Sequence, residues 1–161
     1  MSRAFTKETD GQELDELPER IVSTHRNLVT ARGLAQIENK LRELRLAASD
    51  ARARDDRAEL ARLERELRYW AQRLGSAELV PSPEDTQTVR FGSEVTVLDD
   101  QGHERRYLIV GEDEAEPRDG FISYVSPLAQ SLIGCGVGDT ASISGHEFAI
   151  VAIHQPAAEN A

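Results

Sequence analysis

The sequence is poor in the bulky apolar side chains that build one large core. Of its 161 residues only 5% are aromatic, namely four Phe, three Tyr and one Trp, whereas 30% are charged. This composition leaves too little large apolar surface for a single core that spans every residue. We therefore expect part of the chain to be elongated or disordered.

Cysteine and long apolar runs are also scarce. The single cysteine, Cys135, excludes an intramolecular disulfide and has no neighbouring set of zinc ligands, which suits a reducing compartment. No stretch approaches the run of about 20 apolar residues that a membrane helix needs, and the N-terminus lacks the apolar core of a signal peptide. These absences predict a cytoplasmic protein with no membrane partner.

Acidic residues outnumber basic ones, and most of the excess lies in the C-terminal part of the chain. The formal net charge is −10, which argues against a protein that coats nucleic acid. Residues 30–79 carry 11 basic and 9 acidic residues, whereas residues 80–161 carry 4 basic and 14 acidic ones. One acidic run, residues 112–116, is either a partner-binding patch or a solubilising loop.

Two heptad seams of apolar residues follow one another in the middle of the chain. The first repeats at spacings of three and four through Leu34, Ile37, Leu41, Leu44 and Ala48. The second repeats in the same way through Leu60, Leu63, Leu67, Trp70 and Leu74. Such repeats are typical of coiled-coil helices, so each seam predicts one helix.

The two seams are out of phase, which predicts a reversal between them. Continuing the first register would place Asp55 and Arg62 inside, so one unbroken helix is disfavoured. We expect the chain to turn back near residues 50–56 and to form an antiparallel coiled-coil hairpin over residues 30–79. Residues 1–28 show no helical or strand periodicity and predict a flexible N-terminal arm.

The pattern changes to short alternating runs after a linker at residues 80–88. Strands are expected at residues 94–98, 106–110, 121–125, 141–143 and 148–153. Ser126 as N-cap, Pro127 at the first helical position and Gly134 as a stop predict one short helix. The sequence thus predicts an α+β fold, with a small β-sheet domain over residues 89–155 and a tail over residues 156–161.

Several runs in the C-terminal part resemble one protein family. The runs are Phe91–Val97, Tyr107–Ala115, Ile122–Ser123 and Ser126–Gly134. In order and spacing they are similar to the FKBP-like C-terminal domain of the bacterial GreA/GreB transcription elongation factors. Residues 30–34 and 67–74 are similar to the start and the end of the coiled coil of that family, whereas residues 1–28 have no counterpart there.

The resemblance implies an accessory factor and not an enzyme. Members of the family bind RNA polymerase at the rim of its secondary channel, within an elongation complex that holds DNA and nascent RNA. Their C-terminal domain docks on the polymerase, and the matching docking residues here are Ser126 and Pro127. Their hairpin tip carries acidic residues that help to bind magnesium for cleavage of backtracked RNA.

The motif that matches this acidic tip is Asp56-Arg57-Ala58-Glu59. Asp56 and Glu59 are therefore the candidate catalytic and metal-binding residues, for a magnesium ion shared with the polymerase and not bound stably by this chain. The same spacing also places two carboxylates on one solvated helix face. Both arms look about ten residues shorter than those of full-length factors, or roughly 15 Å at helical rise.

Three hypotheses follow from the resemblance and from the short arms. The chain stimulates transcript cleavage, or it is a non-cleaving regulator that competes with longer factors for the polymerase. In the third hypothesis it is a general interaction module whose hairpin binds another partner.

Overall fold

The computed structural model describes residues 18–158, which form two compact units. Within the described range, the first unit holds residues 18–24 and 37–75, and the second holds residues 25–36 and 76–158. Of the helices in this range, none combines the length and the apolar character that crossing a membrane requires.

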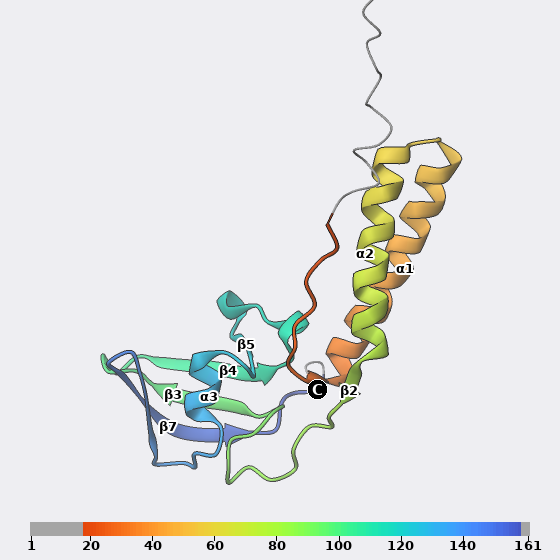
Figure 1. The fold of residues 1–161 in the computed structure, drawn as a ribbon. Coiled ribbons are helices and arrows are strands. Elements are labelled where there is room, and N and C mark those ends of the chain that lie inside the picture. Colours follow the sequence, from red (N-terminus) through yellow and green to blue (C-terminus); the bar gives the residue numbers. More distant parts are fainter. Residues whose placement is uncertain (1–17, 159–161) are drawn as a thin grey trace, which may run out of the picture. The chain divides into compact units, whose positions relative to one another are not determined.

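The first unit is a helical hairpin, as predicted from the two seams (Figure 1). Helix α1 (Ala31–Ala53) belongs to this unit from Ile37 onward, and α2 (Arg57–Gly75) runs back beside it. The buried core residues between the helices are Leu44, Ala48, Ala51 and Leu63, with Leu60, Leu67 and Trp70 packed against them. At a rise of ~1.5 Å per residue the two helices are about 34 and 28 Å long.

Residues 18–24 pack against α2. The Arg20 guanidinium lies 2.6 Å from the Glu66 carboxylate and 3.7 Å from the centre of the Tyr69 ring, which combines an ion pair with a cation–π contact. Glu19 accepts a hydrogen bond of 2.6 Å from Arg68, and this bond holds the pKa of Glu19 below its ordinary value.

The prediction of a flexible arm over residues 1–28 is therefore wrong for residues 18–28, which have fixed contacts, while residues 1–17 lie outside the described residues. Strand β1 (Asn27–Val29) pairs in parallel with β2 (Ala77–Leu79), which occupies the last residues of the predicted hairpin range. The backbone N–H of Val80 also donates to Val29, at 2.9 Å.

The second unit contains a five-stranded sheet that carries most of its core (Figure 1). In spatial order the strands are β5 (Phe121–Ser123), β4 (Glu104–Val110), β3 (Glu94–Leu98), β7 (His146–His154) and β6 (Thr140–Ile143). Neighbours are antiparallel except β4 and β5, which are parallel. Helix α3 (Pro127–Leu132) contributes Ala129 and Leu132 to the core, and the short 3₁₀ helices η1 (Glu112–Glu114) and η2 (Pro117–Asp119) connect β4 to β5.

A buried carboxylate caps the start of α1 inside the second unit. Thr30 is the N-cap, because its hydroxyl oxygen accepts a hydrogen bond of 3.0 Å from Gly33 N. Glu114 accepts hydrogen bonds from the Thr30 N–H, the Thr30 hydroxyl and the Gly111 N–H, at 3.1, 2.5 and 3.2 Å. A Cβ on Gly33 would lie 2.1 Å from Glu114 Cδ, so this position requires glycine. Glu114 accepts from the N-cap N–H as the acid at the third helical position does in a capping box, although it lies 84 positions away in the sequence.

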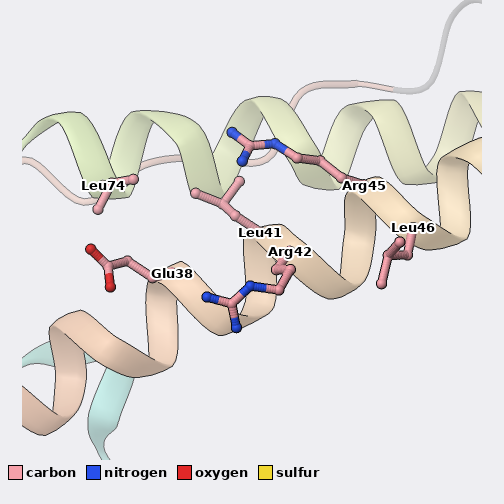
Figure 2. Close-up of a pocket in the computed structure, with 6 residues that line it drawn as sticks. All are labelled: Glu38, Leu41, Arg42, Arg45, Leu46 and Leu74. Atoms are coloured by element: carbon pink, nitrogen blue, oxygen red, sulfur yellow. The ribbon is translucent and has the colours of Figure 1, made fainter.

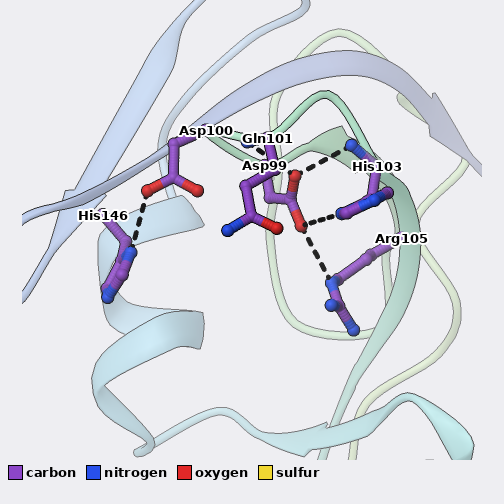
Figure 3. Close-up of polar contacts among 6 residues, drawn as sticks. All are labelled: Asp99, Asp100, Gln101, His103, Arg105 and His146. Carbon is purple, nitrogen blue, oxygen red and sulfur yellow. Dashed lines mark hydrogen bonds and ion pairs between the residues drawn. The ribbon is translucent and has the colours of Figure 1, made fainter.

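The turn between β3 and β4 is organised by Asp99 (Figure 3). Its Oδ1 accepts hydrogen bonds from Gln101 N at 3.0 Å and from His103 N at 2.8 Å, and its Oδ2 lies 3.4 Å from Arg105. The hydrogen bond from the His103 backbone is the main reason that the pKa of Asp99 lies below its ordinary value. The fold class predicted from the sequence, a hairpin followed by a β-sheet domain with one short helix, is thus confirmed.

Candidate functional site

The hairpin reverses over residues 54–56, inside the range predicted from the seams. Asp55 has φ of 54°, in the left-handed region that glycine usually occupies. Asp56 N donates to Ala51 O at 3.0 Å and Asp55 N to Arg52 O at 3.2 Å, which is the Schellman pattern of a helix end. The tip is therefore a tight turn in which the start of α2 follows directly on the end of α1.

Asp56, the first candidate metal ligand, is the N-cap of α2. Its Oδ1 accepts a hydrogen bond of 3.1 Å from Glu59 N, and its carbonyl accepts the first helical bond from Leu60 N at 3.0 Å. Within residues 18–158 no partner contacts its other carboxylate oxygen. Asp56 thus has a structural role that leaves one oxygen available to a ligand.

Glu59, the second candidate, lies in the first turn of α2 and is held by Arg62. Arg62 Nε and Nη2 donate to the two carboxylate oxygens at 2.8 and 2.6 Å. This hydrogen-bonded pair is the main reason that the pKa of Glu59 lies below its ordinary value. Glu59 is therefore ionised at neutral pH, but both of its oxygens are occupied.

The tip alone does not provide a complete metal site. In the described part of the chain, no group of three or more His, Cys, Asp or Glu side chains is arranged to hold an ion. Mg²⁺ prefers about six oxygen ligands and keeps waters where the protein supplies few. Asp56 and Glu59 fit a shared ion only if another molecule supplies further ligands and Arg62 releases Glu59.

The predicted docking residues Ser126 and Pro127 form a corner between β5 and α3. The Ser126 hydroxyl oxygen accepts a hydrogen bond of 3.2 Å from Ala129 N, and Pro127 occupies the first helical position with an exposed ring. Beside them, Gln130 Nε2 donates to Tyr124 O at 2.6 Å. The corner thus presents proline at the surface, whereas the serine hydroxyl is used to cap the helix.

A hollow of about 400 Å³ lies on the side of the hairpin (Figure 2). Its lining consists of Glu38, Leu41, Arg42, Arg45, Leu46 and Leu74. Leu41 lies between the side chains of the two arginines, and Leu46 is 65% exposed. The lining contains no Ser, Thr, Cys, Lys or His side chain, so its one side chain that could act as a nucleophile is the Glu38 carboxylate.

The acidic run at residues 112–116 does not form a continuous exposed patch. Glu114 is only 5% exposed because it caps α1, and Glu112 lies 3.6 Å from His25. Sequence reasoning missed the role of Glu114. The only signals were the two glycines, Gly33 and Gly111, which leave room for its side chain and for the Leu28 carbonyl.

The comparisons with known proteins identify the family. Residues 84–155 match the family described as "Transcription elongation factor, GreA/GreB, C-term". Transcription elongation factor GreA of Methylobacterium sp. (strain 4-46) is 33% identical over 149 residues, which cover 78% of this chain and 94% of that protein. This chain belongs to the GreA/GreB family of transcription elongation factors.

Other relatives of this GreA/GreB family member are similar over less of their length or at lower identity. Transcription elongation factor GreB of Pseudomonas aeruginosa is 35% identical over 126 residues, or 66% of this chain and 75% of that protein. Among solved structures, GreA factor homolog 1 (Gfh1) of Thermus thermophilus is 23% identical, with a TM-score of 0.40 over 81% of this chain and 99% of that one. As a family member, this chain is a transcription elongation factor.

Proposed function

We propose that this factor binds RNA polymerase at the secondary channel and regulates transcript elongation as an accessory protein, with the polymerase as the enzyme. The observation that carries the proposal is the combination of a GreA/GreB C-terminal domain with a helical hairpin whose turn presents acidic residues. Family membership favours polymerase over an unrelated partner for the hairpin.

Docking is assigned to the corner at Ser126 and Pro127. The exposed proline ring offers a rigid apolar contact, and the cap fixes the backbone on either side of it. Pro127→Ala should weaken binding to polymerase core enzyme, since it removes the ring without removing the helix. Ser126→Asp retains an N-cap acceptor and tests whether added charge is tolerated at the corner. Unchanged affinity in both variants would contradict this docking assignment.

Within this function, cleavage stimulation is assigned to Asp56 and Glu59 as ligands of a magnesium ion shared with the polymerase. Within residues 18–158 one carboxylate oxygen of Asp56 has no hydrogen-bond or ion-pair partner, and both carboxylates lie in the turn or the first turn of α2. Bound there, the ion would activate a water molecule and stabilise charge on the scissile phosphate.

A second mode, occupation of the channel without cleavage in competition with longer factors, is favoured by a specific contact. Both oxygens of Glu59 are bound by Arg62, so the ligand pair is not preformed. The helices of 23 and 19 residues are also short, which limits how far the tip reaches.

A transcript-cleavage assay on a stalled, backtracked elongation complex separates the two modes. The decisive variant is Asp56→Ser combined with Glu59→Gln, because serine keeps the N-cap acceptor while both carboxylates are removed. Cleavage that is stimulated by the wild type and lost in this variant, with polymerase binding retained, supports metal donation. A wild type that binds polymerase, stimulates no cleavage and blocks a cleaving GreA supports competition.

A further inference from the structure

The hollow on the hairpin lies on the side that residues 18–24 leave uncovered. On α2, Arg20 contacts Glu66 and Tyr69, each of which comes one position before a residue of the apolar seam. On α1, Glu38 and the two arginines of the lining each come one position after a seam residue. In an antiparallel pair, the positions that follow the seam on both helices share one side of the hairpin, and those that precede it share the other. The hollow and residues 18–24 are therefore on opposite sides.

An ion pair between the helices marks the same side as the hollow. Arg52 follows the buried Ala51, Glu64 follows the buried Leu63, and their side chains meet at 3.2 Å. This pair closes the side toward the hairpin turn. The hollow occupies the stretch between the pair and the base of the hairpin.

The hollow combines apolar side chains with an opening to solvent. Leu41 and Leu74 line it between the two helices, and Leu46 stands at its rim with 65% exposure (Figure 2). One exposed leucine is common on a protein surface, but this one borders a hollow of about 400 Å³ that two further leucines line. Covering such a surface with another apolar surface is favourable.

The charges of the lining have opposite signs at a fixed spacing. Glu38 and Arg45 are seven positions apart on α1, which is about two helical turns or ~10 Å along the axis, so they share one face. Within residues 18–158 neither of them takes part in an ion pair. Arg42 lies between them and donates to Asn39 Oδ1 at 2.7 Å. An acid and a base placed in this way are complementary to a second copy of the same face turned end for end.

We propose that two copies of this chain associate through this side of the hairpin, with their α1 helices antiparallel about a two-fold axis near Arg42. Glu38 of each copy then lies opposite Arg45 of the partner subunit, so both acids and both bases are paired. The two leucine-lined hollows face each other and are covered. Every contact is made twice, as an isologous interface requires, and the four helices form a bundle.

The charge pattern favours a second copy over a polyanion or an acidic helix. Either of these would place Glu38 against like charge, whereas a second copy pairs it. Arg42 is the one charge of the lining without a counterpart, because the axis brings it near its own copy. This repulsion, and a contact limited to part of one side of the hairpin, predict weak association with a Kd of about 10–100 µM.

The test is analytical ultracentrifugation of the full chain without polymerase, over about 1–500 µM. We expect a reversible equilibrium between monomer and dimer. Arg45→Glu should weaken association at least about tenfold, because it places like charges opposite each other twice. Lys40→Glu is the matched control: it makes the same charge change at an exposed position that precedes the seam, on the other side of α1, and should alter Kd less than about twofold.

A charge swap tests the antiparallel register. Glu38→Arg alone should weaken association as Arg45→Glu does, but the double variant restores opposite charges and should associate within about threefold of the wild type. An equimolar mixture of the two single variants should also form a dimer, although neither associates alone. Loss of folding cannot produce such rescue. Arg42→Gln removes the charge without a counterpart and should strengthen association.

The apolar part of the contact is tested separately. Leu46→Glu should weaken association at least about tenfold, because it places a charge at the rim of the covered hollow. Ile21→Glu is its control, since Ile21 is 94% exposed in the segment on the opposite side of the hairpin, and it should leave Kd nearly unchanged.

Three results would overturn the proposal, and none of them bears on polymerase binding by the docking corner. They are a wild type that stays monomeric over the whole range, a mixture of the two single variants that does not associate, and equal weakening by Leu46→Glu and Ile21→Glu. A monomeric wild type whose binding to polymerase core enzyme is weakened by Leu46→Glu would assign this side of the hairpin to the polymerase.

Discussion

Replacing Glu114 by alanine should destabilise the second unit more than almost any other single change to a polar residue. The wild-type carboxylate accepts three hydrogen bonds, from Thr30 N, the Thr30 hydroxyl and Gly111 N, and is 5% exposed. The hydroxyl can rotate to another acceptor, but the two backbone N–H groups cannot. A buried donor that loses its partner costs ~1–3 kcal/mol, so two of them together with the lost packing predict a loss of about 3–5 kcal/mol.

Glu114→Gln is the control that separates hydrogen bonding from packing. Its side-chain oxygen can accept from Thr30 N and Gly111 N, while its amide group can donate to the Thr30 hydroxyl oxygen. We expect this variant to lose only about 1 kcal/mol, since the bonds remain but are no longer charge-assisted. Urea unfolding followed by circular dichroism gives the free energies, with equal m-values as the test of comparability.

Hydrogen exchange gives a local measure of the same network. In Glu114→Ala the amides of Thr30 and Gly33 should exchange faster, because the N-cap of α1 has lost the group that orients it. A loss below about 1 kcal/mol in Glu114→Ala, or equal losses in the alanine and glutamine variants, would refute the role assigned to this carboxylate.

Two further predictions concern titration. Arg62→Ala should raise the pKa of Glu59 toward its ordinary value, because the hydrogen bonds from Arg62 are the main reason that this pKa is lowered. Carbon-detected NMR titration of the Glu59 carboxyl group measures the pKa, and an unchanged value would contradict the pairing with Arg62. Asp99 has a lowered pKa when folded, so its contribution to stability is present above its unfolded pKa of about 3.9 and is lost as the pH falls through the folded pKa. The difference in unfolding free energy between wild type and Asp99→Asn should therefore shrink at acidic pH, and a difference that stays constant between about pH 6 and pH 2 would show that the charge is not involved.

Much of the fold could be predicted because its elements carry local patterns. The out-of-phase seams predicted a hairpin, and a core that includes Leu44 and Leu63 bears this out. The helix signals at Ser126 and Pro127 were likewise sufficient for α3. Strands β1 and β2 carry no such pattern, because each has only three residues. Their pairing is also distant in the sequence, since Asn27 pairs with Ala77, 50 positions away. Strands this short are too brief to show alternation.

The candidate site was harder to predict because one sequence pattern serves two physical roles. The pattern Asp-x-x-Glu fits the proposed pair of metal ligands, but it also fits an N-cap followed by an acid in the first turn of a helix, and Asp56 does cap α2. Glu59 also has a structural role, because it forms an ion pair with Arg62, yet exposed ion pairs of this kind contribute little to the stability of the fold. A divalent cation that reached the tip with its other ligands in place could therefore displace Arg62 at small cost.

The distance to which the hairpin tip extends then decides whether the tip can meet such a cation. This distance is set by the lengths of the two helices, 23 and 19 residues, and not by the charge at the tip. Lengthening both arms by one heptad each, in register with the seams, would extend the tip by about 10 Å while leaving Asp56, Glu59 and Arg62 unchanged. If the extended protein stimulated cleavage where the natural chain did not, the length of the hairpin arms would be the limiting factor. If neither protein stimulated cleavage, the ion pair between Glu59 and Arg62 would have to be stronger than the solvent exposure of the two side chains indicates.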